Sequence, residues 1–129
     1  RMVSQIEHAD ISVVLDMSLL HVVNIFGTLK EGGLIIINSP MNPDGLRFDV
    51  KVRIATVDAG GIAMRNRLMR EGKPIVNTPM LGAFAKATNL VSLDAVEKGL
   101  KGKISSAVFA ANTAVLRDAY EQTIIQTVD

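Results

Sequence analysis

The sequence predicts an α/β fold: a three-layer, mostly parallel sheet flanked by helices. Two continuously apolar, β-branched runs, "ISVVLD" (Ile11–Asp16) and "GLIIINS" (Gly33–Ser39), are typical of strands buried on both faces. Helical patterns alternate with such runs, and strand–helix–strand order implies parallel pairing through right-handed crossovers. A length of 129 residues suits one core, so we predict a single domain over residues 1–129.

The first half of the chain alternates strands with one helix. Ser18 can cap a helix over Leu19–Lys30, since Gly32 follows just beyond it. Residues 39–45, "SPMNPDG", carry the Pro, Asn, Asp and Gly of a loop. The segment 46–58 is predicted to be extended, and its "IATV" (Ile54–Val57) is predicted as a buried strand.

The second half is predicted to be mainly helical. A helix over Gly61–Arg70 precedes a short strand, "PIV" (Pro74–Val76). Thr78 is the expected N-cap of the next helix, and Pro79 would occupy its first position, where a missing N–H costs nothing.

Two further helices close the chain. Ser92 is expected to cap the first, which carries an apolar stripe and can end at Gly102. The second is predicted over Ser106–Thr127.

The helix that begins at Thr78 raises a question, because "PMLGAFAKA" is apolar on almost every side. It is either a central core helix or a helix partly covered by another chain. The candidate interface residues are Met80, Leu81, Phe84 and Tyr120.

Composition narrows the classes of function. Apolar residues make up 48% and the net charge is +1, which gives no support for binding to nucleic acid or to a membrane surface. The absence of cysteine excludes disulfides and thiolate-bound metal clusters on this chain, and it fits a cytoplasmic protein. His8 and His21 lack the spacing of metal ligands, so we predict no metal site. Neither a nucleophile elbow nor a glycine-rich phosphate fingerprint occurs, so we predict no catalytic residue.

Ligands of parallel sheets gather at the carboxyl ends of strands, and polar or glycine residues stand at four such ends. The candidate ligand contacts are Asp16, Asn38, Ser39, Asp58, Gly60, Gly61, Asn77 and Thr78. Turn formation alone would also explain these residue types. A cationic segment, "MRNRLMREGK", is either an ordinary solvated surface or a contact for an anion or a partner.

The order of these segments resembles the gamma subunit, or gamma domain, of the thiamine-dependent 2-oxoacid:ferredoxin oxidoreductases, of the pyruvate or ketoisovalerate type. The matching strand patterns are "AD…D" (Ala9, Asp10, Asp16) and "LKxGG…N" (Leu29, Lys30, Gly32, Gly33, Asn38). The helical patterns are "NxxxLGA" from Asn77, "KxxxLVxLDxV" from Lys86, and "N…L…Y" through Asn112, Leu116 and Tyr120.

The resemblance implies an accessory subunit of an enzyme that oxidises a 2-oxoacid to acyl-coenzyme A and reduces ferredoxin. Thiamine diphosphate, Mg and iron–sulfur clusters would be held by partner subunits of alpha, beta and delta type. This chain would contribute to assembly and to contacts with coenzyme A, would be inactive alone and would form a homo-oligomer.

One departure from the family pattern is the absence of a "GxGGQG" turn from this sequence. The resemblance therefore implies that the chain is the C-terminal part of a gamma domain without its leading βαβ unit. An alternative reading of the residues is a stand-alone, doubly wound regulatory domain that binds a nucleotide or metabolite.

Overall fold

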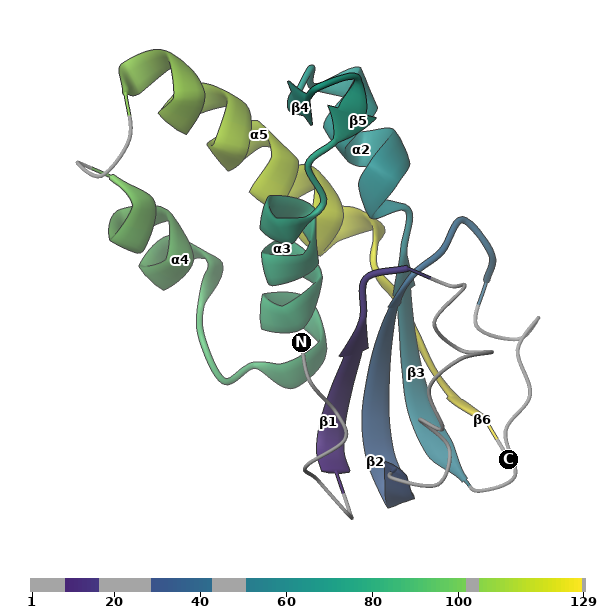
Figure 1. Cartoon of the computed structure of the whole chain (residues 1–129). Coiled ribbons are helices and arrows are strands. Elements are labelled where there is room, and N and C mark those ends of the chain that lie inside the picture. The colour runs from purple at the N-terminus through teal and green to yellow at the C-terminus, as the bar shows by residue number, and fades with distance from the viewer. Residues whose placement is uncertain (1–8, 17–28, 43–50, 102–104, 129) are drawn as a thin grey trace. The chain divides into compact units, whose positions relative to one another are not determined.

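The computed structural model describes residues 9–16, 29–42, 51–101 and 105–128 (Figure 1). The chain divides into two compact units. The sheet unit comprises the residues up to Val57 together with those from Ile124 onward, and the helical unit comprises Asp58–Thr123.

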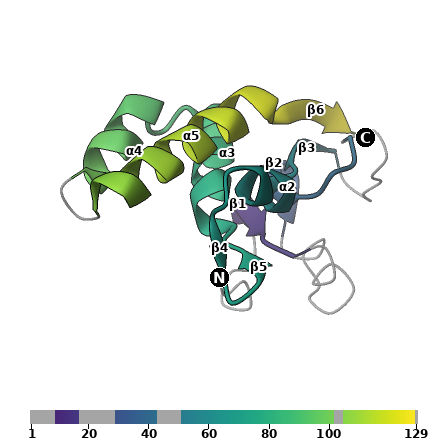
Figure 2. The ribbon, with the colours of Figure 1, turned by 90° about the horizontal axis from the view of Figure 1, so that it is seen from above.

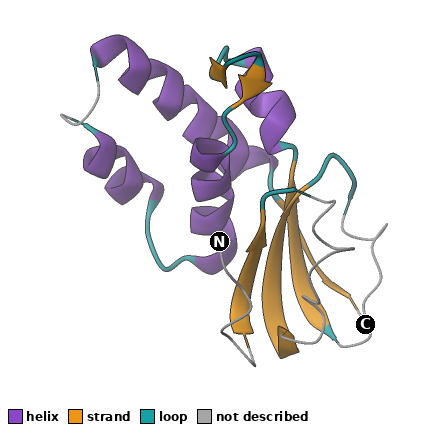
Figure 3. Ribbon diagram, in the orientation of Figure 1, coloured by secondary structure: helices purple, strands orange, loops and turns teal. Residues whose placement is uncertain are grey.

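The sheet unit contains four described strands, drawn in orange in Figure 3 and labelled in Figure 1, and their order is β1-β2-β3-β6. Strands β1 (Ala9–Val14), β2 (Leu29–Asn38) and β3 (Val52–Val57) are mutually parallel. Strand β6 (Ile124–Val128) pairs with β3 in the antiparallel direction. The predicted α/β class with a mostly parallel sheet is confirmed.

The second half of strand β2 is buried on both faces. Ile35, Ile36 and Ile37 have no exposed surface, although successive side chains of a strand point to opposite faces. Burial on both faces explains why this run is continuously apolar, as parallel strands commonly are.

Strand β2 begins earlier than the sequence indicated. Leu29 and Lys30 were expected in the last turn of a helix, but they belong to β2, where Leu29 pairs with Ala9. Just beyond them, the Gly32 N–H donates to the Lys51 carbonyl at 2.8 Å, so the backbone here finds partners on neighbouring extended segments. The rest of the expected helix and the first part of segment 46–58 lie outside the described residues.

The end of the chain also differs from the prediction. The last helix, α5 (Ser106–Gln122), does not continue to Thr127, because residues from Ile124 form strand β6. The sequence "IIQTV" is rich in β-branched side chains, and its backbone pairs with β3 from Val52 to Thr56. Pairing with a strand so distant in sequence outweighed the helical pattern that precedes it.

The helical unit starts with a short helix and a hairpin. Helix α2 (Ala59–Arg65) is shorter than the predicted Gly61–Arg70, because the Asn66 side chain donates to the Ile62 carbonyl at 2.9 Å and Arg67 turns into a left-handed conformation. Strands β4 (Met69–Arg70) and β5 (Lys73–Pro74) then form a two-stranded hairpin. The predicted strand over Pro74–Val76 is wrong for Ile75 and Val76, which lie between β5 and the next helix.

Helix α3 (Asn77–Thr88) starts one residue before the predicted cap. Val76 is the N-cap residue and makes no side-chain cap bond, so the assignment of Thr78 as N-cap is wrong. Pro79 becomes the third helical residue instead of the first. It is still tolerated, because N–H groups of the first turn have no intrahelical acceptor.

The remaining helices begin at serine caps. The Ser92 hydroxyl accepts from the Ala95 N–H at 3.0 Å and starts α4 (Leu93–Leu100), as predicted. Ser105 caps α5 through the Val108 N–H at 3.4 Å. Figure 2 shows α4 and α5 side by side. Helix α4 has no buried residue, whereas α5 buries an apolar set near its middle and end: Val115, Leu116 and Ala119.

Candidate functional site

The carboxyl ends of β1 and β2 are held together by Asn38. Its side-chain amide donates to the Leu15 carbonyl at 3.0 Å, which ties the end of β2 to the residue just before Asp16. Asp16 itself is exposed. The structure therefore brings Asp16 and Asn38 to one edge of the sheet unit, as the parallel topology predicts.

Ser39 continues this edge toward β3. Its N–H donates to the Val57 carbonyl at 2.9 Å, and its hydroxyl accepts from the Met41 N–H at 3.1 Å. The residue is 2% exposed. Its polar groups are thus engaged in turning the chain, which is the structural interpretation that the sequence left open.

Asp58, Gly60 and Gly61 form the start of α2 in the helical unit. The Asp58 carboxylate accepts from the Gly61 N–H at 3.1 Å and caps the helix. A Cβ at Gly61 would lie 2.3 Å from the carboxylate oxygen Oδ2 of Asp58, so this cap requires glycine. The carboxylate occupies the position that an anionic ligand would need at this helix end.

Thr78 is used within the helical unit. Its hydroxyl donates to Asn112 Oδ1 at 2.7 Å, and the Asn112 amide donates to the Val108 carbonyl at 2.8 Å. Asn112, on α5, is 8% exposed, and sequence reasoning gave it no partner. Asn77 is exposed at the start of α3. Thr78 thus belongs to a polar link between α3 and α5, and Asn77 lies beside it.

The four interface candidates have different surroundings. Met80 is 4% exposed, whereas Leu81 is 44% exposed. Phe84 is half-buried, and half-buried Tyr120 receives the Lys86 ammonium over its ring, 4.9 Å from the centroid. Of this set, Leu81 is best suited to meet another chain.

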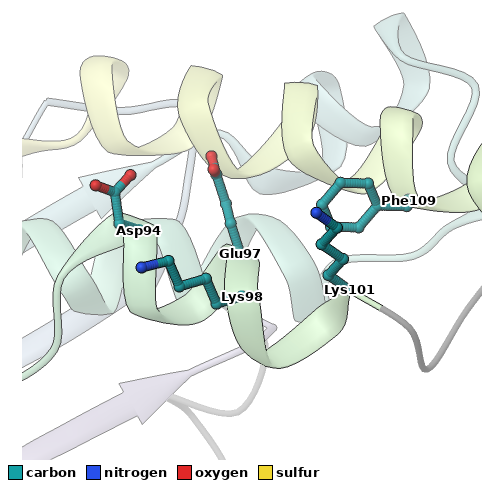
Figure 4. A pocket seen from close by; sticks show the side chains of 5 residues that line it. All are labelled: Asp94, Glu97, Lys98, Lys101 and Phe109. Atoms are coloured by element: carbon teal, nitrogen blue, oxygen red, sulfur yellow. The ribbon is translucent and has the colours of Figure 1, made fainter.

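A pocket of about 220 Å³ lies between α4 and α5 (Figure 4). Sequence reasoning treated its residues only as parts of helix surfaces. Three charged side chains on α4, a fourth just after it and one aromatic ring on α5 line the pocket: Asp94, Glu97, Lys98, Lys101 and Phe109.

The charges of this pocket are partly neutralised. Glu97 and Arg117 form an ion pair, in which Nη2 donates to Oε2 at 3.1 Å and Nε lies 2.9 Å from Oε1. A hydrogen bond between a guanidinium and a carboxylate is stronger than one between neutral groups, because both partners are charged. The ion pair joins α4 to α5, so Glu97 has a structural role at the wall of the pocket.

The described part of the chain offers little for metal or membrane chemistry. Within it, no three His, Cys, Asp or Glu side chains are grouped so that they could hold a metal ion. Over the same ranges, none of the helices is long and apolar enough to span a bilayer.

The chain is therefore an α/β protein in which most polar residues at the strand ends and helix starts form hydrogen bonds within the chain. Residues 2–122 match the model of the pyruvate ferredoxin/flavodoxin oxidoreductase family. The chain belongs to this family, which confirms the resemblance drawn from the sequence.

Two curated relatives illustrate the similarity. The chain is 38% identical to the pyruvate/ketoisovalerate oxidoreductases common subunit gamma of Thermococcus litoralis, over 97% of this chain and 67% of the relative. It is 41% identical to the pyruvate synthase subunit PorC of Methanothermobacter marburgensis, over 92% of this chain and 62% of the relative.

A solved structure supports the same fold. The pyruvate oxidoreductase subunit PORC of Thermotoga maritima superposes with a TM-score of 0.81 at 32% identity, over 96% of this chain and 68% of that chain. The chain thus spans about two thirds of the length of these relatives.

Proposed function

We propose that this chain is an accessory gamma subunit or domain of a 2-oxoacid:ferredoxin oxidoreductase. The observation that carries the proposal is the 38% identity to a common gamma subunit over 97% of the chain. The enzyme would oxidise pyruvate or a related 2-oxoacid to acyl-coenzyme A and reduce ferredoxin. The stand-alone regulatory domain is less well supported, because the matched relatives carry the names of oxidoreductase subunits.

In this proposal the carbon chemistry takes place on other subunits. The chain has no cysteine, so it has no thiolate for an iron–sulfur cluster. Its best-placed carboxylates have structural partners: Asp58 caps α2 and Glu97 binds Arg117. Partner subunits of alpha, beta and delta type would hold thiamine diphosphate, Mg and the clusters.

This chain would contribute to assembly and to contacts with coenzyme A. Asp16 and Asn38 support the second role, because they lie at the carboxyl edge of a parallel sheet, where ligands of such folds bind. Leu81 supports the first, since 44% of this large apolar residue is exposed on α3. The partner proposed for this face is a second copy of the chain, which gives a homo-oligomer.

The test compares the chain alone with the chain combined with the other subunits of its source organism. The chain alone should give no turnover with pyruvate, ketoisovalerate, coenzyme A and a viologen dye, and the complete set should give turnover that depends on this chain. Turnover by the chain alone, free of other subunits, would refute the accessory role. A complete set equally active without the chain would refute its membership of the enzyme.

A further inference from the structure

The hairpin after α2 concentrates positive charge. Residues 65–73, called the basic hairpin below, contain four cations and one carboxylate, Glu71. Their net charge is +3, whereas the whole chain carries +1, so the other residues together carry −2. The four cations are Arg65, Arg67, Arg70 and Lys73.

Three of these cations have no partner in the described part of the chain. Arg67, Arg70 and Lys73 are exposed, and their side chains make no ion pair or hydrogen bond there. Arg65 differs from these three, because its Nη2 donates to Gln122 Oε1 at 3.5 Å. Arg117, by contrast, is neutralised by Glu97.

The fold brings two of the cations directly opposite each other. Arg70 pairs with Lys73 across the two-residue turn Glu71–Gly72. Like charges at opposed positions of an antiparallel pair destabilise it. Carboxylates of an acidic partner would relieve this repulsion, because they would attract both Arg70 and Lys73.

The backbone of the basic hairpin is held in a fixed and costly shape. Glu71 and Gly72 have φ of 52° and 78°, as a primed hairpin turn requires, and Arg67 has φ of 59°. Residues other than glycine rarely adopt this region, and such strain is typical of functional segments. The Leu68 N–H donates to the Ala63 carbonyl at 2.8 Å, and the Ile75 N–H donates to the Leu68 carbonyl at 2.9 Å. The backbone that carries Arg67, Arg70 and Lys73 is therefore held in one conformation.

Two methionines add apolar surface around the cations. Met64 is 58% exposed and Met69 is 38% exposed. Flexible thioether side chains adapt to irregular protein surfaces. A mixture of cations and methionines suits a protein surface better than a phosphate backbone, whose binding depends mainly on charge.

We propose that the basic hairpin is a docking surface for an acidic face of another subunit of the same enzyme. This inference rests on the proposed function, which makes such subunits available. Complementary charge would guide association and fix its register, so binding should weaken as salt rises from about 0.05 M to about 0.5 M.

The test uses charge reversal with a matched control. Arg70→Glu/Lys73→Glu keeps two like charges opposed but inverts their sign, and because Glu71 adds a third carboxylate the folding of this variant is checked. Lys98→Glu/Lys101→Glu makes the same change in net charge on exposed residues of α4 and the position just after it. Binding to the purified complex of the other subunits is measured by interferometry at several salt concentrations, and circular dichroism reports folding.

The hairpin variant should bind roughly tenfold or more weakly at low salt and lose most of its salt dependence, while the control binds as the parent does. If the parent binds and both variants match it, the hairpin is not the docking surface, although the proposed function stands. If the parent fails to bind, the proposed function fails, and this inference fails with it. Binding to heparin is measured in parallel. If the hairpin variant loses binding to heparin but still binds the other subunits as the parent does, the hairpin is a polyanion surface and the proposal is overturned.

Discussion

Gly82 lies where α3 crosses α5, and its missing side chain permits the close approach. A Cβ at this position would lie 2.5 Å from the Leu116 carbonyl oxygen and 3.0 Å from the Ala119 Cβ. The small residues of "LGAFAKA" are therefore explained by the close packing of α3 against α5 within the helical unit. The neighbouring Ala83, Ala85 and Ala87 are at most 3% exposed.

We expect Gly82→Ala to destabilise the protein. The gain in helix propensity, about 1 kcal/mol, is outweighed by a contact that only movement of the α5 backbone can relieve, and overpacking of this kind typically costs about 1–3 kcal/mol. Urea unfolding, followed by circular dichroism, measures the net loss. Gly99→Ala on α4 is the control, because a Cβ there would meet no atom within 4 Å, and it should stabilise slightly or change nothing. A Gly82→Ala variant as stable as Gly99→Ala would contradict the close crossing.

The Thr78 hydroxyl gives a second prediction at this scale. Thr78→Val removes the donor to Asn112 Oδ1 but keeps the β-branched shape. Asn112 is 8% exposed, so its oxygen would lose a partner in a poorly hydrated position, at a cost of roughly 1–2 kcal/mol. Thr78→Ser keeps the hydroxyl and should recover most of this loss. Equal stability of the Val and Ser variants would mean that the hydrogen bond from the Thr78 hydroxyl to Asn112 does not stabilise the fold.

Among the elements, those determined by local pattern were predicted well. The parallel strands followed from the runs around Ile11 and Ile35, and the start of α4 followed from Ser92. The elements missed by sequence reasoning depend on distant partners. Strand β6 exists because β3 offers it hydrogen bonds, and a pattern of β-branched residues after a helix was the signal available.

The candidate site was predicted in outline only. Parallel topology explains why Asp16 and Asn38 share an edge. Local sequence could not reveal that the Thr78 hydroxyl is occupied by a residue 34 positions away, or that Glu97 binds Arg117. Such partners depend on how α5 packs, which no short motif specifies.

Helix α4 should open locally before the rest of the helical unit. It has no fully buried residue, so the Ser92 cap and the Glu97–Arg117 pair supply a large share of its stability. Ser92→Ala removes the acceptor for the Ala95 N–H and should cost about 1 kcal/mol in the opening of α4. Hydrogen exchange of α4 amides should quicken about fivefold, while α5 amides from Val115 onward stay protected. Ser92→Asp, which retains a capping oxygen, should exchange like the parent, and unchanged protection in the Ala variant would count against the cap.

At the scale of the whole molecule, the exposed apolar residues near the α3–α5 link carry the prediction of self-association. Leu81 is 44% exposed and Val108 is 45% exposed. Each lies about one helical turn from the hydrogen-bonded pair formed by Thr78 and Asn112, so the two apolar side chains flank the same polar link. A two-fold contact would bury both residues twice with a single surface.

We expect the chain to form a homodimer or a higher oligomer at micromolar concentration. Leu81→Glu should convert it to monomer with little change in folding, because a charge on an exposed position remains hydrated in the monomer but would be desolvated in the contact. Ala95→Glu, on the exposed face of α4, is the control and should leave the size unchanged. Light scattering coupled to size exclusion gives the mass of each variant, and circular dichroism confirms that each is folded. A monomeric parent, indistinguishable in size from Leu81→Glu, would mean that α3 meets no second copy and that its apolar surface serves other subunits or the core alone.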